Sequence, residues 1–343
     1  MSIIIPDLDE SIITFMDLPE TLNLMQVNKN YYEKIKHQKI LCEWNEMKLI
    51  KTKSIHDIFQ RTCTKGYINY AKSLIRRYNK INIHADNEYA FKRTCERGHL
   101  DVAKWLIDLH ECDYGKIDIH VDNKFAFGLA RECGHLHVAK WLIDPHKYGY
   151  GKINIHVGNE YAFKKTCERG YLDVAKWLID LHERDYGKID IHVDNEMAFR
   201  LACEWGHLHV AKWLIDLHKY GYGKINIHAD NEMAFILTCV RGHLDVAKWL
   251  IDLDDCGYGK IDIHSNNEGT FRWACEHGHL HIAKWLINLH DCGYNKINIH
   301  ANNEYAFSWA CFNGHMHIAK WLIDLHASGY GKINQEHINH YMN

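Results

Sequence analysis

The stretch HADNEYAFKRTCERGHLDVAKWLIDLHECDYGKI, residues 84–117, decides the fold because close copies of it fill most of the chain. Its first residue returns every 36 positions, as His84, His120, His156, His192, His228, His264 and His300. Residues 55–78 hold a further, shortened copy. Repetition at a fixed period of this length is the signature of a solenoid, whose repeats bury their apolar faces against their neighbours. The architecture therefore follows from what the copies share, and function must lie where they differ.

Each copy predicts two helices joined by a tight turn. Asn87 is followed by an acid, so we expect Asn87 to cap the first helix and the acid to favour its N-terminus. Gly98 predicts a left-handed turn that ends this helix. The second helix should span residues 99–109.

A connecting arm follows the second helix. Tyr114, Gly115 and Lys116 predict a turn, and Asn295 replaces the glycine in one copy, as the residue that next most readily adopts a positive φ. Ile117 and Ile119 alternate with polar residues. That period of two predicts a short, strand-like hairpin arm between repeats.

Composition excludes several classes of partner. The 343 residues contain 41 Lys and Arg against 44 Asp and Glu, a net charge of −3, which gives no general electrostatic case for nucleic acid. The first residues lack the pattern of a signal peptide, and no apolar run approaches a membrane span. We expect a cytoplasmic protein that binds neither nucleic acid nor membrane, with a nuclear location left open.

Cysteine use agrees with a reducing compartment. Seven of the 12 cysteines occupy one position of the repeat, namely Cys63, Cys95, Cys167, Cys203, Cys239, Cys275 and Cys311. Helices pack about 8–10 Å apart, which is beyond the reach of a disulfide between stacked copies. We expect these side chains to be small, buried and reduced.

Histidine pairs suggest metal ligands, but their context argues for a structural use. The pairs are His135 and His137, His207 and His209, His279 and His281, and His315 and His317. Other copies carry Asp at the second position, and no Cys-x-x-Cys or His-Glu-x-x-His motif accompanies them. Nucleophile and phosphate-binding motifs are also missing from the sequence. We expect no metal, no cofactor, no catalytic residues and no enzymatic activity.

The plan of helix, turn, helix and projecting arm resembles the ankyrin repeat. The resemblance rests on Gly98 to Ile107, GHLDVAKWLI, and covers residues 55–333 in about eight copies. The match departs where ankyrin repeats have Thr-Pro-Leu-His, here residues 89–92. The repeated Phe, Cys and Lys-Trp-Leu-Ile pattern looks like the multi-copy ankyrin proteins of giant DNA viruses that infect amoebae. The resemblance implies an all-α ankyrin-repeat solenoid with short hairpin arms, placed in the host-cell cytoplasm if the protein is viral.

Residues 1–54 stand outside the repeats and predict a small helical N-terminal cap. The order of Ile-Pro-Asp-Leu, Met-Asp-Leu-Pro and a later Tyr pair also resembles an F-box, the module that docks on the Skp1 adaptor of cullin ubiquitin ligases. The resemblance implies that the adaptor, a host protein if the chain is viral, would contact Leu8, Ile12, Ile13 and Leu24. A structural cap without any ubiquitin link remains the alternative.

The first helix has a constant face and a variable face. Ala90, Phe91, Thr94, Cys95 and Gly98 recur, as a core stripe should. The opposite positions vary, and in ankyrin arrays this helix lines the concave surface, which implies that the variation faces a partner. Exposed aromatic and arginine side chains are typical anchors of protein interfaces. The predicted partner-binding residues are Leu201, Trp205, Ile236, Leu237, Arg272, Trp273, Trp309 and Phe312.

Packing between repeats or neutral drift would explain the same variation. The constant tryptophans, such as Trp105 and Trp213, instead predict packing between repeats. The expected organisation is an N-terminal segment at 1–54, an ankyrin array at 55–333 and a C-terminal tail at 334–343. We expect a monomeric interaction scaffold whose protein partner the sequence does not name, either plain or serving as a ubiquitin-ligase adaptor.

Overall fold

The computed structural model describes residues 54–78, 81–119, 121–143 and 153–342, and the side chains of residues 121–125 are left out. The F-box-like residues Leu8, Ile12, Ile13 and Leu24 lie outside this range. The chain divides into two bodies, residues 1–153 and 154–343, which are described separately. No helix of the described residues is long and apolar enough to cross a membrane.

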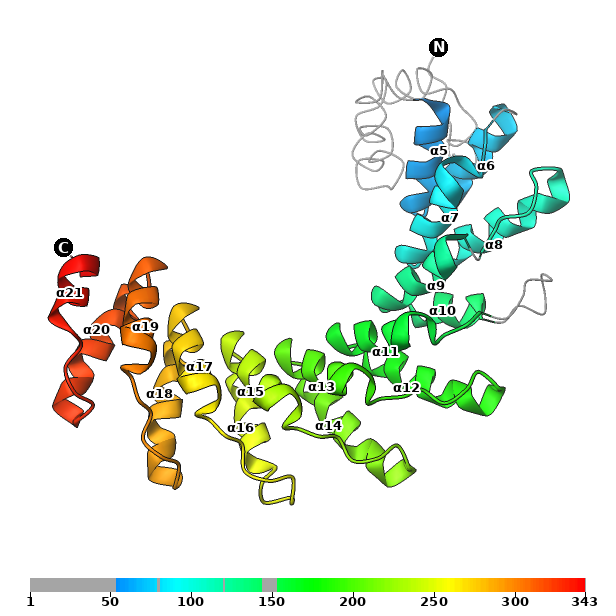
Figure 1. The fold of residues 1–343 in the computed structure, drawn as a ribbon. Helices are drawn as coiled ribbons and strands as arrows, with labels where there is room; N and C mark the ends of the chain where they lie inside the picture. The colour runs from blue at the N-terminus through cyan, green and yellow to red at the C-terminus, as the bar shows by residue number, and fades with distance from the viewer. Residues whose placement is uncertain (1–53, 79–80, 120, 144–152, 343) are drawn as a thin grey trace, which may run out of the picture. The chain divides into compact units, whose positions relative to one another are not determined.

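Both bodies are rows of paired α-helices (Figure 1). The N-terminal body contains α5 (Ile55–Thr64), α6 (Ile68–Arg77), α7 (Ala85–Glu96), α8 (Leu100–Asp108), α9 (Val121–Glu132) and α10 (Leu136–Leu142). The first part of the C-terminal body contains α11 (Val157–Glu168), α12 (Leu172–Asp180), α13 (Val193–Glu204), α14 (Leu208–Asp216), α15 (Ala229–Val240) and α16 (Leu244–Asp252). The second part contains α17 (Ser265–Glu276), α18 (Leu280–Asn288), α19 (Ala301–Phe312), α20 (Met316–Asp324) and α21 (Gln335–Met342). Short 3-10 helices follow most second helices, the first being Leu109–Cys112.

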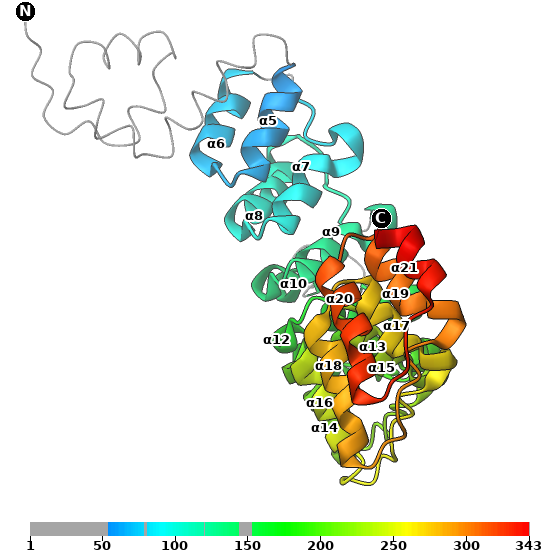
Figure 2. The same ribbon diagram turned by 90° about the vertical axis from the view of Figure 1, so that its left-hand side faces the viewer.

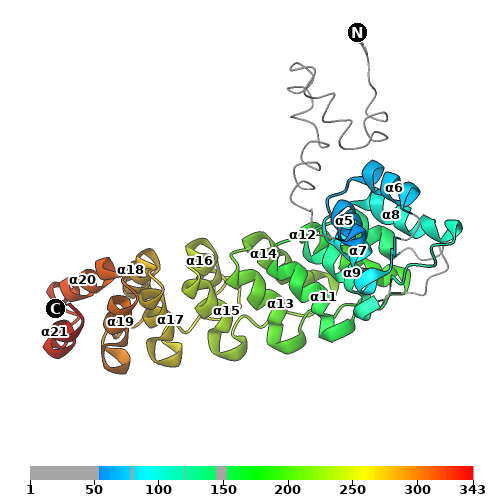
Figure 3. The same cartoon turned by 90° about the horizontal axis from the view of Figure 1, so that it is seen from above.

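The C-terminal body has two layers. Viewed along the row, α13, α15, α17 and α19 lie on one side and α14, α16, α18 and α20 on the other (Figure 2). Each first helix packs extensively against the next first helix, whereas the second helices have few contacts with one another. This row curves with its first helices on the inner side (Figure 1), and the view from above shows the two layers side by side (Figure 3). The tail beyond residue 333 forms α21, which packs on α19.

A ladder of Phe and Trp side chains joins neighbouring repeats. Phe163 contacts Trp213 with ring centroids 6.2 Å apart, and Phe199 contacts Trp249 at 6.3 Å. The Phe at the constant first-helix position is buried in every described repeat, and in most of them it is sealed completely. Repeat-to-repeat packing of the constant tryptophans is therefore confirmed. The contact between a buried Phe ring and a half-buried Trp ring at each junction removes apolar surface from water and so helps to hold one repeat to the next.

The turn glycines are required by conformation and by space. Gly98 has φ +78°, and a Cβ there would lie 2.6 Å from Nδ1 of His135 in the next repeat. The second member of the pair, His137, places Nε2 3.0 Å from the carbonyl oxygen of Gly98. The predicted left-handed turn and the structural use of these histidines are both confirmed.

The start of the first helix differs from the prediction. Asn87 has φ +58° and lies in a left-handed turn with Asp86 and Glu88, and His84 occupies the cap position without a side-chain capping bond to the helix amides. The prediction that Asn87 caps the first helix is therefore wrong. Consecutive left-handed residues are costly unless their surroundings hold them. The surroundings do so because the turn directs Glu88 into a buried network.

We call this network the His–Glu latch. Nδ1 of His84 lies 2.7 Å from Oε1 of Glu88, and Nε2 lies 2.7 Å from the carbonyl oxygen of Tyr114. The same Glu88 oxygen accepts the backbone N–H of Asp118 at 3.1 Å. Because both ring nitrogens face acceptors, the latch favours the doubly protonated ring. Burial alone would lower the pKa of His84, but the bonds to Glu88 and Tyr114 raise it above its usual value.

The latch explains why no strand-like arm forms in the described residues. Ile117 and Ile119 are buried and Asp118 is exposed, so the predicted alternation is present. The backbone N–H that a ladder would use is instead taken by the carboxylate of Glu88. The arm forms no strand in the described residues, and the prediction of a strand-like hairpin is wrong in this respect.

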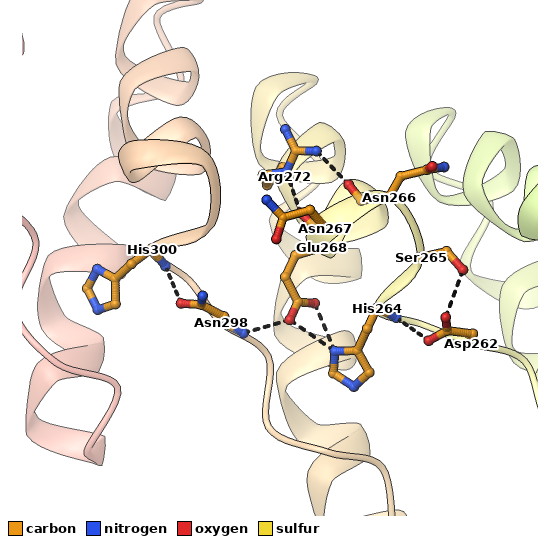
Figure 4. Close-up of polar contacts among 9 residues, drawn as sticks. All are labelled: Asp262, His264, Ser265, Asn266, Asn267, Glu268, Arg272, Asn298 and His300. Atoms are coloured by element: carbon orange, nitrogen blue, oxygen red, sulfur yellow. Dashed lines mark hydrogen bonds and ion pairs between the residues drawn. The ribbon is translucent and has the colours of Figure 1, made fainter.

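One latch is incomplete, and its sequence shows why (Figure 4). Nε2 of His264 is sealed from solvent and has no hydrogen-bond partner among the residues that the structure describes. The residue after Tyr294 is Asn295, which does not adopt the positive φ of Gly115 and its equivalents. The Tyr294 carbonyl oxygen lies 3.1 Å from Nδ1 of His290 instead. The expectation that Asn295 would reproduce the glycine turn is therefore wrong.

Candidate partner-binding surface

An apolar strip crosses four successive first helices of the C-terminal body. It consists of Leu201 on α13, Leu237 on α15, Trp273 on α17 and Trp309 on α19, one equivalent position in each repeat. Leu201, Leu237 and Trp273 are half-buried and Trp309 is exposed, and the equivalent residue on α11 is Lys165. The inner layer thus changes from charged to apolar along the row. This finding agrees with the variable face predicted from the sequence.

Two of the predicted partner-binding residues are buried. Ile236 is 1% exposed and Arg272 is 5% exposed. Their position, one residue before the strip, faces the next repeat: Lys164 pairs with Asp194, and Arg200 pairs with Asp230. The expectation of exposure is wrong for this position because it makes contacts between repeats. The buried position and the strip position are adjacent on the variable face of the helix, so the sequence pattern did not distinguish them.

Trp205 and Phe312 flank the strip and are exposed by 43% and 71%. Arg241 lies over the Trp205 ring, 4.6 Å from its centroid, and donates to Oε1 of Glu204 at 2.8 Å. This arrangement holds the indole in place and leaves its edge open. A ring already ordered loses less conformational entropy when a partner covers it.

The C-terminal end of the strip is an aromatic cluster on α19. Tyr305 stacks on Trp309 at 5.5 Å, and Trp309 meets Phe312 edge-on at 5.3 Å. The Tyr305 hydroxyl donates to Oε2 of Glu276 at 2.9 Å. Burial, followed by this hydrogen bond, raises the pKa of Tyr305. The cluster therefore stays neutral and apolar at physiological pH.

Trp273 owes its position to a neighbouring glycine that the sequence analysis did not single out. Most other repeats carry Tyr or Met at the position of Gly269, and a Cβ there would lie 3.0 Å from the Trp273 ring. The missing side chain lets the indole lie against its own helix. Comparing Gly269 with its copies would have revealed this space.

The titratable groups of the repeat serve the fold. Burial raises the pKa of the Cys203 thiol and its equivalents, which makes these thiols poor nucleophiles. Burial also lowers the pKa of His207, whose Nε2 lies 3.0 Å from the carbonyl oxygen of Glu168. No group of three potential ligands able to hold a metal ion occurs among the residues that the structure describes.

Comparison with known proteins assigns the repeats. No curated protein matches the sequence. A family model described as ankyrin repeats (3 copies) matches residues 161–267 and 271–340, just over half of the chain. The matched segments contain the helix pairs α13 to α20, their left-handed turns and the strip described above. The chain therefore belongs to the ankyrin-repeat family.

Proposed function

We propose that the chain is a non-catalytic scaffold that binds a partner protein through the apolar strip and its two flanking residues, Trp205 and Phe312. Ankyrin repeats are protein–protein interaction modules. The observation that carries the proposal is the row of open apolar side chains at one repeat position, ending in Trp309 and Phe312. Phe312 is 71% exposed, and its edge-on contact with Trp309 orders it without covering it. Such an ordered aromatic patch is typical of the energetic centre of an interface.

The alternative is that the strip only packs repeats together, and paired variants separate the two. We expect Trp309→Ala to abolish partner binding and to leave the unfolding temperature nearly unchanged, because this ring makes its contacts within α19 and its surface. The control is Trp213→Ala, which removes a ring packed on Phe163 and should destabilise the protein by roughly 3 kcal/mol. Peptides selected from a random 12-residue display library on the full-length protein serve as the ligand. Strong destabilisation by Trp309→Ala would assign the ring to the core.

At a finer level, we infer that the chain recruits its bound partner to a ubiquitin ligase through residues 1–54. The support is the F-box-like order of apolar and proline residues around Leu8, Ile12, Ile13 and Leu24. Full-length protein should retain purified Skp1 on a column, and Leu8→Asp should abolish retention. Trp309→Ala should retain Skp1, since it changes only the strip. If wild-type protein fails to bind Skp1, the plain scaffold with a structural N-terminal segment is the correct description.

A further inference from the structure

Arg272 is a buried cation without an acidic partner. Its side chain is 5% exposed, and none of the described carboxylates forms an ion pair with it. Nε donates to the carbonyl oxygen of Asn267 and Nη2 to that of Asn266, both at 2.8 Å (Figure 4). Two neutral carbonyl groups satisfy hydrogen bonds but supply no counter-charge. Burying an unpaired charge is costly, so this site favours an incoming anion.

Other repeats show what is missing. Arg200, the equivalent residue on α13, donates through Nη1 to Oδ2 of Asp230. Oδ1 of Asp230 accepts from Nδ2 of Asn195 at 2.8 Å. At Arg272 the acid has become Asn302, which keeps the second contact, with Nδ2 of Asn267 donating to its Oδ1 at 2.8 Å. In Asn302 an amide nitrogen therefore replaces the carboxylate oxygen that would neutralise the guanidinium.

The two turns beside Arg272, at residues 266–267 and 302–303, carry asparagines and no acids. Asn266, Asn267, Asn302 and Asn303 are all exposed, whereas the earlier repeats hold Asp194 and Asp230 at the first position of each such pair. Nδ2 of Asn302 makes no hydrogen bond within the described part of the chain. An exposed amide donor therefore occupies the position from which Asp230 neutralises Arg200, and an amide donor together with an unneutralised guanidinium suits a carboxylate.

The same arginine is continuous with the aromatic cluster. Its guanidinium carbon lies 4.7 Å from the Tyr305 ring centroid and 5.7 Å from that of Trp273. Tyr305 stacks on Trp309, which contacts Phe312. A partner that places a carboxylate at Arg272 would therefore set its adjacent apolar side chains on these rings.

We infer that Arg272 and Asn302, bordered by Trp273 and Tyr305, form a carboxylate-binding site for an Asp or Glu side chain of the partner protein. Apolar residues next to that acid cover Trp309 and Phe312. The occupant is thus a segment in which an acid accompanies aromatic or aliphatic residues. Charge complementarity carries this choice, since the site holds one unpaired positive charge and no exposed acid in its asparagine rim. The inference rests on the proposed function, because it defines the partner of the same surface.

The decisive variant is Asn302→Asp, which restores the internal acid. Asp is compatible with this backbone, because Asp194 and Asp230 adopt φ +52° at the equivalent positions and Asn302 has φ +53°. The variant should fold, gain thermal stability and neutralise Arg272 from within. The converse variant, Asp230→Asn, removes the acid that pairs with Arg200. It should lower the stability of the protein and leave binding at the strip unchanged.

The ligands are peptides selected from the random 12-residue library on full-length wild-type protein, each resynthesised with its acids changed to Gln or Asn. We expect the acidic form to bind about tenfold more tightly than its amide counterpart, as for one charge-assisted hydrogen-bonded pair. In Asn302→Asp that preference should fall below about twofold, while the amide peptide binds equally to both proteins. Isothermal titration calorimetry measures all four affinities.

Each outcome decides one of the two proposals. Peptides that need Trp309 but show no acid preference, or keep it in Asn302→Asp, overturn the carboxylate site and leave the scaffold function standing. A library that yields no peptide dependent on Trp309 overturns both. A preference that is present in wild-type protein and lost in Asn302→Asp supports both.

Discussion

The incomplete latch at His264 predicts that one substitution far from the strip will stabilise the protein. Changing Asn295 to Gly should restore the left-handed turn and return the Tyr294 carbonyl oxygen to Nε2 of His264. In the complete latches of the C-terminal body this distance is 2.6–2.8 Å. The variant would give the latch of the sixth full repeat, which begins at His264, the geometry of its neighbours.

The size of the effect follows from three contributions. Leaving a sealed polar group unpaired costs about 1–3 kcal/mol, which the new hydrogen bond recovers. The added glycine increases the freedom of the unfolded chain and costs about 0.4–1 kcal/mol. Release of His290 from the Tyr294 carbonyl oxygen loses an exposed bond of about 0.5 kcal/mol. The net stabilisation should be about 1 kcal/mol.

Local hydrogen exchange is the appropriate assay because repeat proteins open one segment at a time. Amides of α17 to α20 should gain roughly fivefold protection in Asn295→Gly. The reverse change, Gly259→Asn, should break the complete latch on His228, whose carbonyl partner is Tyr258, and should lower protection nearby. Unchanged protection in both variants would refute the assignment of the latch as a stabilising contact.

Two further variants test the latch and the turn. Burial tends to lower the pKa of His192, but its hydrogen bonds to Glu196 and to the Tyr222 carbonyl oxygen together raise it. Glu196→Gln should therefore lower this pKa, which NMR titration measures. An unchanged pKa would contradict the assignment. Because the folded pKa is raised, the stability lost in the variant should be largest below the unfolded pKa of about 6.5 and should vanish as pH rises through the folded value. Gly206→Ala should destabilise by more than about 2 kcal/mol, since a Cβ would meet His243 at 2.6 Å, whereas Gly314→Ala adds only about 1 kcal/mol of left-handed strain with no atom within 4 Å. Equal unfolding free energies for the two alanine variants would exclude the clash.

The sequence predicted the repeat period, the helix pairs and the core, because each position of the repeat can be compared across many copies. Phe163 and Trp213 recur in every full repeat, and both pack as expected. Gly98 also recurs at a position where only glycine fits. Shared features of a solenoid are therefore visible from one chain.

Contacts between repeats could not be read in the same way. The Glu of the latch looked like a first-turn acid because capping and long-range bonding use the same residue type, and only coordinates show that Glu88 reaches Asp118 thirty residues later. Ile236 looked exposed because helical periodicity does not reveal that the neighbouring repeat covers it. Both errors concern pairs of residues that are distant in sequence.

A comparison across that same distance of thirty residues would have exposed the most informative departure. Lys164 and Arg200 each have an Asp thirty positions on, and where the cation is lost, at Ile236, the partner has also become Asn266. Cation and acid are thus present or absent together, as a contact between repeats requires. Arg272 breaks this rule by keeping a buried positive charge after its acid became Asn302, at the repeat that also carries Trp273. A charge retained without an internal use, beside the aromatic end of the strip, is best accounted for by a counter-charge that the partner supplies.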